Sequence, residues 1–238
     1  MEPELQPIRT GQSGPGSIVL GRAIGAEAQK VLRNTSLLLA LTMLPTIGGA
    51  FLGMASGGII LQHPIISTFV MLGAVIGLQF AIVANRNSLA GVALLLLMTG
   101  VLGWWLGPIL NFALALKNGG QLVGYAAGGT ALVLFAMATV ATTTKRDFSF
   151  MGKFLFVGMI ALLIAMLANL WLQIPALALT ISTLVIVVFS LFLLHDLSRI
   201  VTGGETNYII AATGVYMSLF NIFANLLSLL MALSGERE

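Results

Sequence analysis

Long, uninterrupted runs of apolar residues dominate the chain. No Asp, Glu, Lys or Arg occurs in residues 34–85, 87–116, 118–144, 154–195 or 206–235. A helix that crosses a membrane needs about 20 apolar residues, so each run is long enough for one or two helices. The runs are continuous, whereas the strands of a membrane barrel alternate apolar and polar residues. The pattern therefore predicts an all-α integral membrane protein.

The runs are broken where glycine, proline, asparagine and charged residues cluster. The breaks leave seven expected transmembrane helices, at residues 35–56, 65–84, 89–111, 122–143, 154–172, 176–194 and 208–233. Residues 1–33 form a polar tail, which we expect to be partly disordered and to carry a short interfacial helix in its second half. Residues 34–233 then form the transmembrane domain, and residues 234–238 a short C-terminus.

Composition and charge support this interpretation. Charged residues make up 8% of the chain and the mean hydropathy is +1.03, whereas a soluble domain has about 25% charged residues. Loops rich in Lys and Arg stay in the cytoplasm. A cytoplasmic N-terminus leaves Lys117 and Arg237 outside and places nine basic residues inside: Arg9, Arg22, Lys30, Arg33, Arg86, Lys145, Arg146, Lys153 and Arg199. We therefore expect a cytoplasmic N-terminus and an extracytoplasmic C-terminus, and no nucleic-acid partner.

Small residues recur at four-residue spacing in several of the expected helices. This spacing lets helix backbones approach closely in lipid, so it predicts tight packing within the bundle. The glycines concerned are Gly49, Gly53 and Gly57, then Gly73 and Gly77, Gly103 and Gly107, and Gly124 and Gly128.

The last expected helix carries a stripe of small and polar residues. They recur at steps of four and three, which places them on one helical face: Asn207, Ala211, Gly214, Ser218, Asn221, Asn225 and Ser228. Amides are unfavourable against lipid, so the stripe is expected to face protein or water, with the last helix central in the bundle. Two interpretations remain open: hydrogen bonds between helices, or the lining of a water-filled path.

Asp196 is the most informative charged residue. It follows a long apolar run, stands beside His195, and has Arg199 one turn further on. It is either a solvated residue at a helix end, paired with Arg199, or a carboxylate partly inside the bundle. In the second case desolvation raises its pKa, and Arg86, at a similar depth, is a candidate partner.

No catalytic constellation is recognisable. The chain has no cysteine, and its two histidines, His63 and His195, fall on opposite expected faces of the membrane. The last helix contains no lysine for a retinal Schiff base. We expect neither enzymatic activity nor a metal or cofactor.

Six segments together resemble the Bax inhibitor-one family, also called the transmembrane Bax inhibitor motif family, and within it a bacterial YccA-like branch. They are KVLRNT at residues 30–35, LGPILN at 106–111, GGTALV at 128–133, KRDFSFMG at 145–152, GGETNYI at 203–209 and YMSLFNIF at 216–223. The resemblance covers residues 30–233. It implies seven helices with the last one central, in the inner membrane of a bacterium.

The resemblance also implies two functions. The YccA-like branch is associated with the membrane-anchored AAA protease FtsH, as an inhibitor that is also a slow substrate taken by its cytoplasmic N-terminal tail. Other members are pH-sensitive calcium leak pathways governed by two aspartates. Asp196 matches the first of these aspartates, but the second position is Ser218 here, so the pair is broken. A sensor in which two carboxylates share a proton needs both acids, so pH gating of that type is not expected here. A slow leak of calcium or protons is the alternative to protease modulation.

Overall fold

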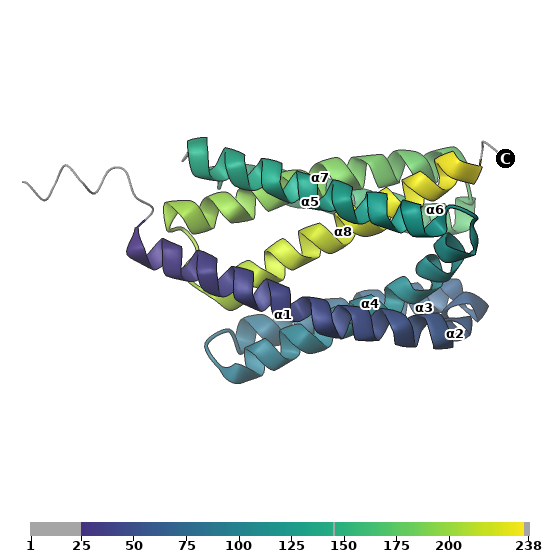
Figure 1. Cartoon of the computed structure of the whole chain (residues 1–238), viewed down its shortest axis with the longest axis horizontal. Helices are drawn as coiled ribbons and strands as arrows, with labels where there is room; N and C mark the ends of the chain where they lie inside the picture. Colours follow the sequence, from purple (N-terminus) through teal and green to yellow (C-terminus); the bar gives the residue numbers. More distant parts are fainter. Residues whose placement is uncertain (1–24, 145, 236–238) are drawn as a thin grey trace, which may run out of the picture.

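The structure is a computed structural model that describes residues 25–144 and 146–235. Most of the expected tail, residues 1–24, lies outside the described residues. The described chain is helical: α1 (Ala26–Ser56), α2 (Gly58–Gln62), α3 (Pro64–Ala84), α4 (Leu89–Ala115), α5 (Gly119–Thr144), α6 (Met151–Leu172), α7 (Pro175–Thr202) and α8 (Tyr208–Gly235) (Figure 1). Seven of these helices, all except the short α2, are long and apolar enough to cross a membrane. The predicted fold class is confirmed.

Two helices extend beyond their expected bounds. α1 begins at Ala26 rather than at residue 35, because Ala28 and Thr35 continue the buried face that Leu38 and Thr42 form further along. The second half of the expected tail is thus, from Ala26 onward, the first turns of α1 and not a separate interfacial helix.

α7 continues to Thr202, although residue 194 was its expected end. Leu197, Ile200 and Val201 are buried and keep the helical spacing of the apolar face. The helix ends where Gly203 adopts a left-handed conformation with φ of 79°, which a residue with a side chain rarely adopts. Asp196 therefore lies within α7, not at its end.

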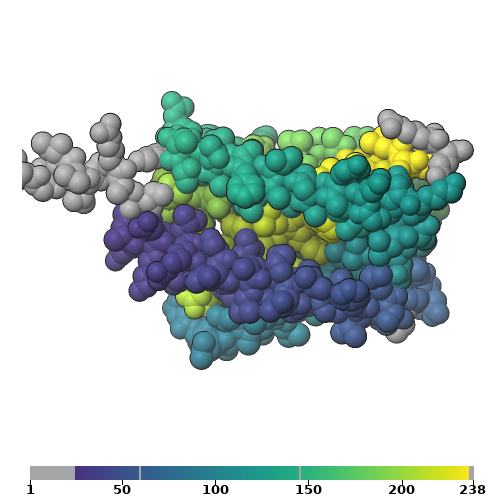
Figure 2. Space-filling model, viewed as in Figure 1, coloured from purple at the N-terminus to yellow at the C-terminus, as the bar shows by residue number. Residues whose placement is uncertain are grey.

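α8 lies in the middle of the bundle. It contacts α1, α3, α4, α5 and α7 and runs obliquely between the pair α1 and α4 and the pair α5 and α7 (Figure 1). Its buried residues Ile209, Ala212 and Tyr216 pack with residues such as Leu95 and Met98 of α4. Atoms of α8 are visible between α1 and α5 in the space-filling view (Figure 2). α6 is peripheral and packs mainly against α7.

The contact between α1 and α4 is made by backbone against backbone. A Cβ atom added to Gly49 would lie 2.0 Å from the Gly100 carbonyl oxygen, and one on Gly53 would lie 2.0 Å from that of Trp104. From the other side, a Cβ on Gly103 would lie 2.1 Å from the Thr46 carbonyl oxygen. The expected glycine packing is thus present between these two helices.

The other glycine pairs behave differently. Cβ atoms added to Gly73 and Gly77 of α3, or to Gly124 and Gly128 of α5, would meet nothing within 4 Å. These four glycines face the outside of the bundle. The expectation that they pack inside it is wrong, because spacing alone does not distinguish a face turned to protein from one turned to lipid.

Candidate functional site

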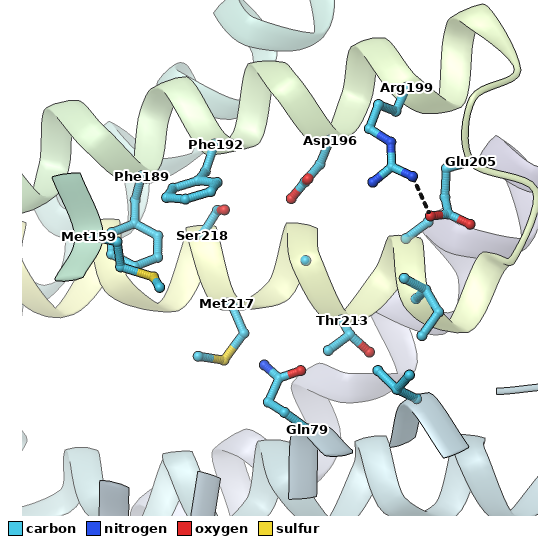
Figure 3. A pocket seen from close by; sticks show the side chains of 14 residues that line it. Gln79, Met159, Phe189, Phe192, Asp196, Arg199, Glu205, Thr213, Met217 and Ser218 are labelled. Carbon is cyan, nitrogen blue, oxygen red and sulfur yellow. Dashed lines mark hydrogen bonds and ion pairs between the residues drawn. The ribbon is translucent and has the colours of Figure 1, made fainter. Parts of the chain in front are cut away.

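A crevice between α7 and α8, flanked by α3 and α6, has a volume of about 310 Å³ (Figure 3). We call it the α7–α8 crevice. Its polar lining is Gln79, Asp196, Arg199, Glu205, Thr213 and Ser218, and the rest is Val83, Met159, Phe189, Phe192, Ile210, Ala211, Gly214 and Met217. Two acids and a base therefore line a crevice whose other lining residues are mostly apolar.

Asp196 projects from α7 toward α8. Its side chain is 20% exposed, and its Oδ1 lies 3.1 Å from Nδ1 of His195. A Cβ atom on Gly214 of α8 would lie 2.6 Å from Asp196 Oδ2. The absence of a side chain at Gly214 therefore leaves room for the Asp196 carboxylate, which explains why a glycine occupies this position of the stripe.

Arg199 and Glu205 close the crevice at the end where α7 turns into α8. An Arg199 nitrogen lies 3.2 Å from Oε2 of Glu205 and donates to the Gly204 carbonyl oxygen at 3.3 Å. Glu205 Oε1 also accepts the backbone N–H of Asn207 at 3.0 Å. Arg199 is thus paired with Glu205 rather than with Asp196, its expected partner at a helix end.

Glu205 was missed as a site residue, because a single acid in a loop between two helices carries no distinguishing pattern. Its side chain is only 15% exposed. The available signal was its position six residues after Arg199 across the Gly203–Gly204 turn, which brings the chain back to the same helix end.

The structure brings together two of the three residues expected to sense ions or protons. Asp196 and Ser218 both line the α7–α8 crevice, and Ser218 is 2% exposed. Arg86 is exposed in the turn between α3 and α4 and does not line the crevice. The cation that does line it is Arg199.

Asn207 begins the polar stripe, but its role is to cap α8. Its Oδ1 accepts the backbone N–H groups of Ile209 and Ile210 at 3.0 and 3.1 Å. Its Nδ2 donates to the Arg86 carbonyl oxygen at 2.8 Å and to Asn87 Oδ1 at 2.9 Å. Asn207 thereby ties the start of α8 to the α3–α4 turn.

The amides further along α8 make bonds within their own helix. Nδ2 of Asn221 donates to the Met217 carbonyl oxygen, and Nδ2 of Asn225 to that of Asn221, both at 2.9 Å. Neither of these two hydrogen bonds joins α8 to another helix, although one interpretation of the stripe predicted such bonds. A helical carbonyl four residues earlier is within reach of an Asn side chain and competes with a neighbouring helix.

A polar contact between helices comes instead from Tyr216, which the sequence did not single out. Its hydroxyl lies 2.8 Å from the hydroxyl of Thr46 in α1 and donates to the Thr99 carbonyl oxygen in α4 at 3.4 Å. Tyr216 is 2% exposed. It joins α8 to both helices of the glycine contact.

The loop before α6 supplies another acid at the same end of the bundle. Asp147 is exposed, and its Oδ1 accepts the Ser149 backbone N–H at 2.8 Å. Hydrogen bonds from the Ser149 side chain and backbone hold the pKa of Asp147 below its usual value of 3.8. Asp147 is therefore ionised at neutral pH.

Within the described residues, no cluster of three or more His, Asp and Glu could hold a metal ion.

Seven apolar helices, the last of them central, with a crevice lined by two acids beside that last helix, define a multi-pass helical membrane protein. Residues 28–235 match the family model described as "Inhibitor of apoptosis-promoting Bax1". The chain belongs to this Bax inhibitor-one family, and its expected resemblance is confirmed.

Bacterial relatives cover most of the chain. It is 42% identical over 205 residues to a protein of Escherichia coli named "Modulator of FtsH protease YccA", with 86% of this chain and 90% of that one covered. It is 39% identical over 204 residues to a protein of Vibrio cholerae named "Uncharacterized membrane protein", covering 86% and 90%. An uncharacterized protein of Pseudomonas aeruginosa is 39% identical over 213 residues, covering 88% and 92%.

Proposed function

We propose that this protein resides in the bacterial inner membrane, binds a membrane-anchored AAA protease of the FtsH type and restrains its proteolysis. The observation that carries the proposal is the 42% identity, over 86% of this chain and 90% of the relative, to a protein named as a modulator of FtsH protease. The alignment is 205 residues long, about the length of the whole expected transmembrane domain of residues 34–233. The protein acts as a regulator in this proposal, and not as an enzyme.

The proposal is tested by reconstitution. Purified FtsH-type protease is placed in proteoliposomes with or without an equimolar amount of this protein, and degradation of a fluorescent membrane substrate is followed. We expect slower degradation with the protein present, and copurification of the two in mild detergent. An unrelated seven-helix membrane protein at the same ratio controls for crowding. Unchanged degradation together with no copurification would refute the proposal.

The tail is proposed to be the segment by which the protease takes this protein as a slow substrate. Deletion of residues 2–20 leaves every described helix intact, since α1 begins at Ala26. We expect the deletion to lengthen the half-life of the protein in cells while copurification persists. Replacement of residues 2–20 by a Gly-Ser sequence of equal length is the matched control, because it separates tail sequence from tail length. An unchanged half-life for both variants argues against the tail.

We propose that the end of the bundle holding the N-terminus of α1 faces the cytoplasm. Among the described residues this end carries Lys30, Arg33, Arg86, Arg146, Lys153 and Arg199, and the opposite end carries Lys117. The difference in basic residues supports a cytoplasmic N-terminus. Cysteines introduced at Ser13, Lys117 and Ser234 are labelled with an impermeant maleimide on intact cells. Labelling at Ser13, or protection at both other positions, would reverse the orientation.

A slow leak of cations or protons is the second candidate, and the α7–α8 crevice favours it. The crevice places the carboxylates of Asp196 and Glu205 within the bundle. In liposomes that contain this protein alone, Asp196→Asn should lower any cation flux and change its pH dependence. Ser218→Asp should split the pH response into two steps, because two close carboxylates titrate as a pair. If the wild-type protein gives no flux, the leak function is refuted, and the proposal of protease modulation is unaffected.

A further inference from the structure

The exposed face of α1 changes character along its length. At 100° per residue, Gln29, Arg33, Leu37, Leu44 and Phe51 fall on one side of the helix. All five are exposed, with exposed fractions of 65% for Leu37 and 67% for both Leu44 and Phe51. The opposite side of α1 is buried against the bundle. This single free face is therefore polar and basic at its N-terminal end and apolar beyond.

The basic end lies where lipid headgroups are expected. From Arg33 to Phe51 the helix rises about 27 Å, close to the hydrocarbon thickness of about 30 Å. Lys30 and Arg33 are also the last charged residues before the charge-free run of residues 34–85. They stand at the boundary between the aqueous and hydrocarbon layers.

Within the described residues, neither Lys30 nor Arg33 takes part in an ion pair. Both are exposed, and the ion pairs within the described residues are His195–Asp196 and Arg199–Glu205, neither of which involves them. An open hollow follows this face of α1, lined by Ala26, Gln29, Lys30, Leu32, Arg33, Ser36 and Leu37. Glu27 and Glu205 line a second hollow, toward the α7–α8 turn, which Lys30 also lines and Arg33 does not.

We propose that this face of α1 is a binding site for an anionic glycerophospholipid. The phosphodiester lies between the Lys30 ammonium and the Arg33 guanidinium, since a guanidinium can bind two phosphate oxygens at once. Gln29 supplies an amide donor beside them. The acyl chains lie along Leu37 and the apolar residues beyond it. The proposed lipid-binding site thus lies on α1, the helix that follows the N-terminal tail.

Binding is measured by titrating dioleoyl phosphatidylglycerol into the detergent-purified full-length protein, with dioleoyl phosphatidylcholine as the zwitterionic lipid with identical chains. Native mass spectrometry counts the bound lipids. The variant Lys30→Gln/Arg33→Gln should bind phosphatidylglycerol about 30-fold more weakly, given the attraction of each basic residue to an anionic lipid. Lys117→Gln/Arg146→Gln removes the same charge from exposed positions elsewhere and should retain binding. Lys30→Arg/Arg33→Lys should also retain most of it.

Several results would overturn the proposal. One is equal binding of the two lipids by the wild-type protein, and another is an equal loss of binding in both charge-removing variants. Inorganic phosphate is added as a competitor at millimolar concentration. If it displaces phosphatidylglycerol so that this lipid no longer binds better than phosphatidylcholine, the site is one for free phosphate. Circular dichroism of each variant checks that the helices are retained, so that a lost site is not mistaken for a lost fold.

Discussion

The backbone contact between α1 and α4 yields a sharp prediction for Gly103→Ala. The added methyl group would lie 2.1 Å from the Thr46 carbonyl oxygen and 2.9 Å from Thr46 Cα, whereas real Cβ contacts essentially never fall below 3.0 Å. The two helices must therefore separate by at least 0.9 Å at this point. Such overpacking costs about 1–3 kcal/mol, and the better helix propensity of alanine returns about 0.5–1 kcal/mol. We expect a net loss of roughly 1–2 kcal/mol in the free energy of unfolding.

The assay is reversible unfolding of the purified protein in mixed micelles, followed by circular dichroism. Gly128→Ala is the matched control, because the same methyl group at that position meets nothing within 4 Å. It should leave stability unchanged or slightly increased. If Gly103→Ala is as stable as the wild-type protein, or if Gly128→Ala is equally destabilised, the tight contact between α1 and α4 is not what holds these helices together.

Three further predictions concern other contacts. Tyr216→Phe removes the bond to Thr46 and should lower the free energy of unfolding by about 0.6–1.7 kcal/mol; a double-mutant cycle with Thr46→Val that shows no coupling would contradict this. Asn207→Ala should cost about 1 kcal/mol and speed hydrogen exchange at the Ile209 and Ile210 amides, while Asn207→Asp should keep the cap. The lowered pKa of Asp147 means that its contribution to stability is present above pH 3.8 and lost as the pH falls through the lowered value. The difference in free energy of unfolding between the wild-type protein and Asp147→Ala should therefore vanish in strong acid. A difference that grows as the pH falls would contradict a lowered pKa for Asp147.

The fold was largely predictable because lipid imposes strict conditions on a chain. Runs without charge have to be helices, and amides have to turn away from lipid, so the seven spans and the central α8 follow from residue types alone. Helix ends were less predictable. α7 extends past Asp196 because Leu197, Ile200 and Val201 remain buried. Gly214 leaves room for the Asp196 carboxylate and Glu205 pairs with Arg199, and all of these contacts depend on tertiary structure.

The candidate site was predictable only in part. Asp196 and Ser218 were expected together, and both line the crevice. Glu205 and Tyr216 were missed, since a loop acid and a single aromatic residue in an apolar run carry no distinguishing pattern. Asn221 and Asn225 are half-buried, and the sequence could not show that each donates a hydrogen bond within its own helix.

The central position of α8 has a consequence for how the protein is made. α8 leaves the ribosome after the other described helices, yet α1, α3, α4, α5 and α7 all contact it. The earlier helices must therefore enter the membrane and wait beside one another without their shared partner, on the order of a few seconds at normal rates of synthesis. During that interval the Thr46 hydroxyl of α1 lacks its partner Tyr216 in α8. A nascent chain that stops before residue 208 therefore lacks the helix that five of the others contact in the finished bundle.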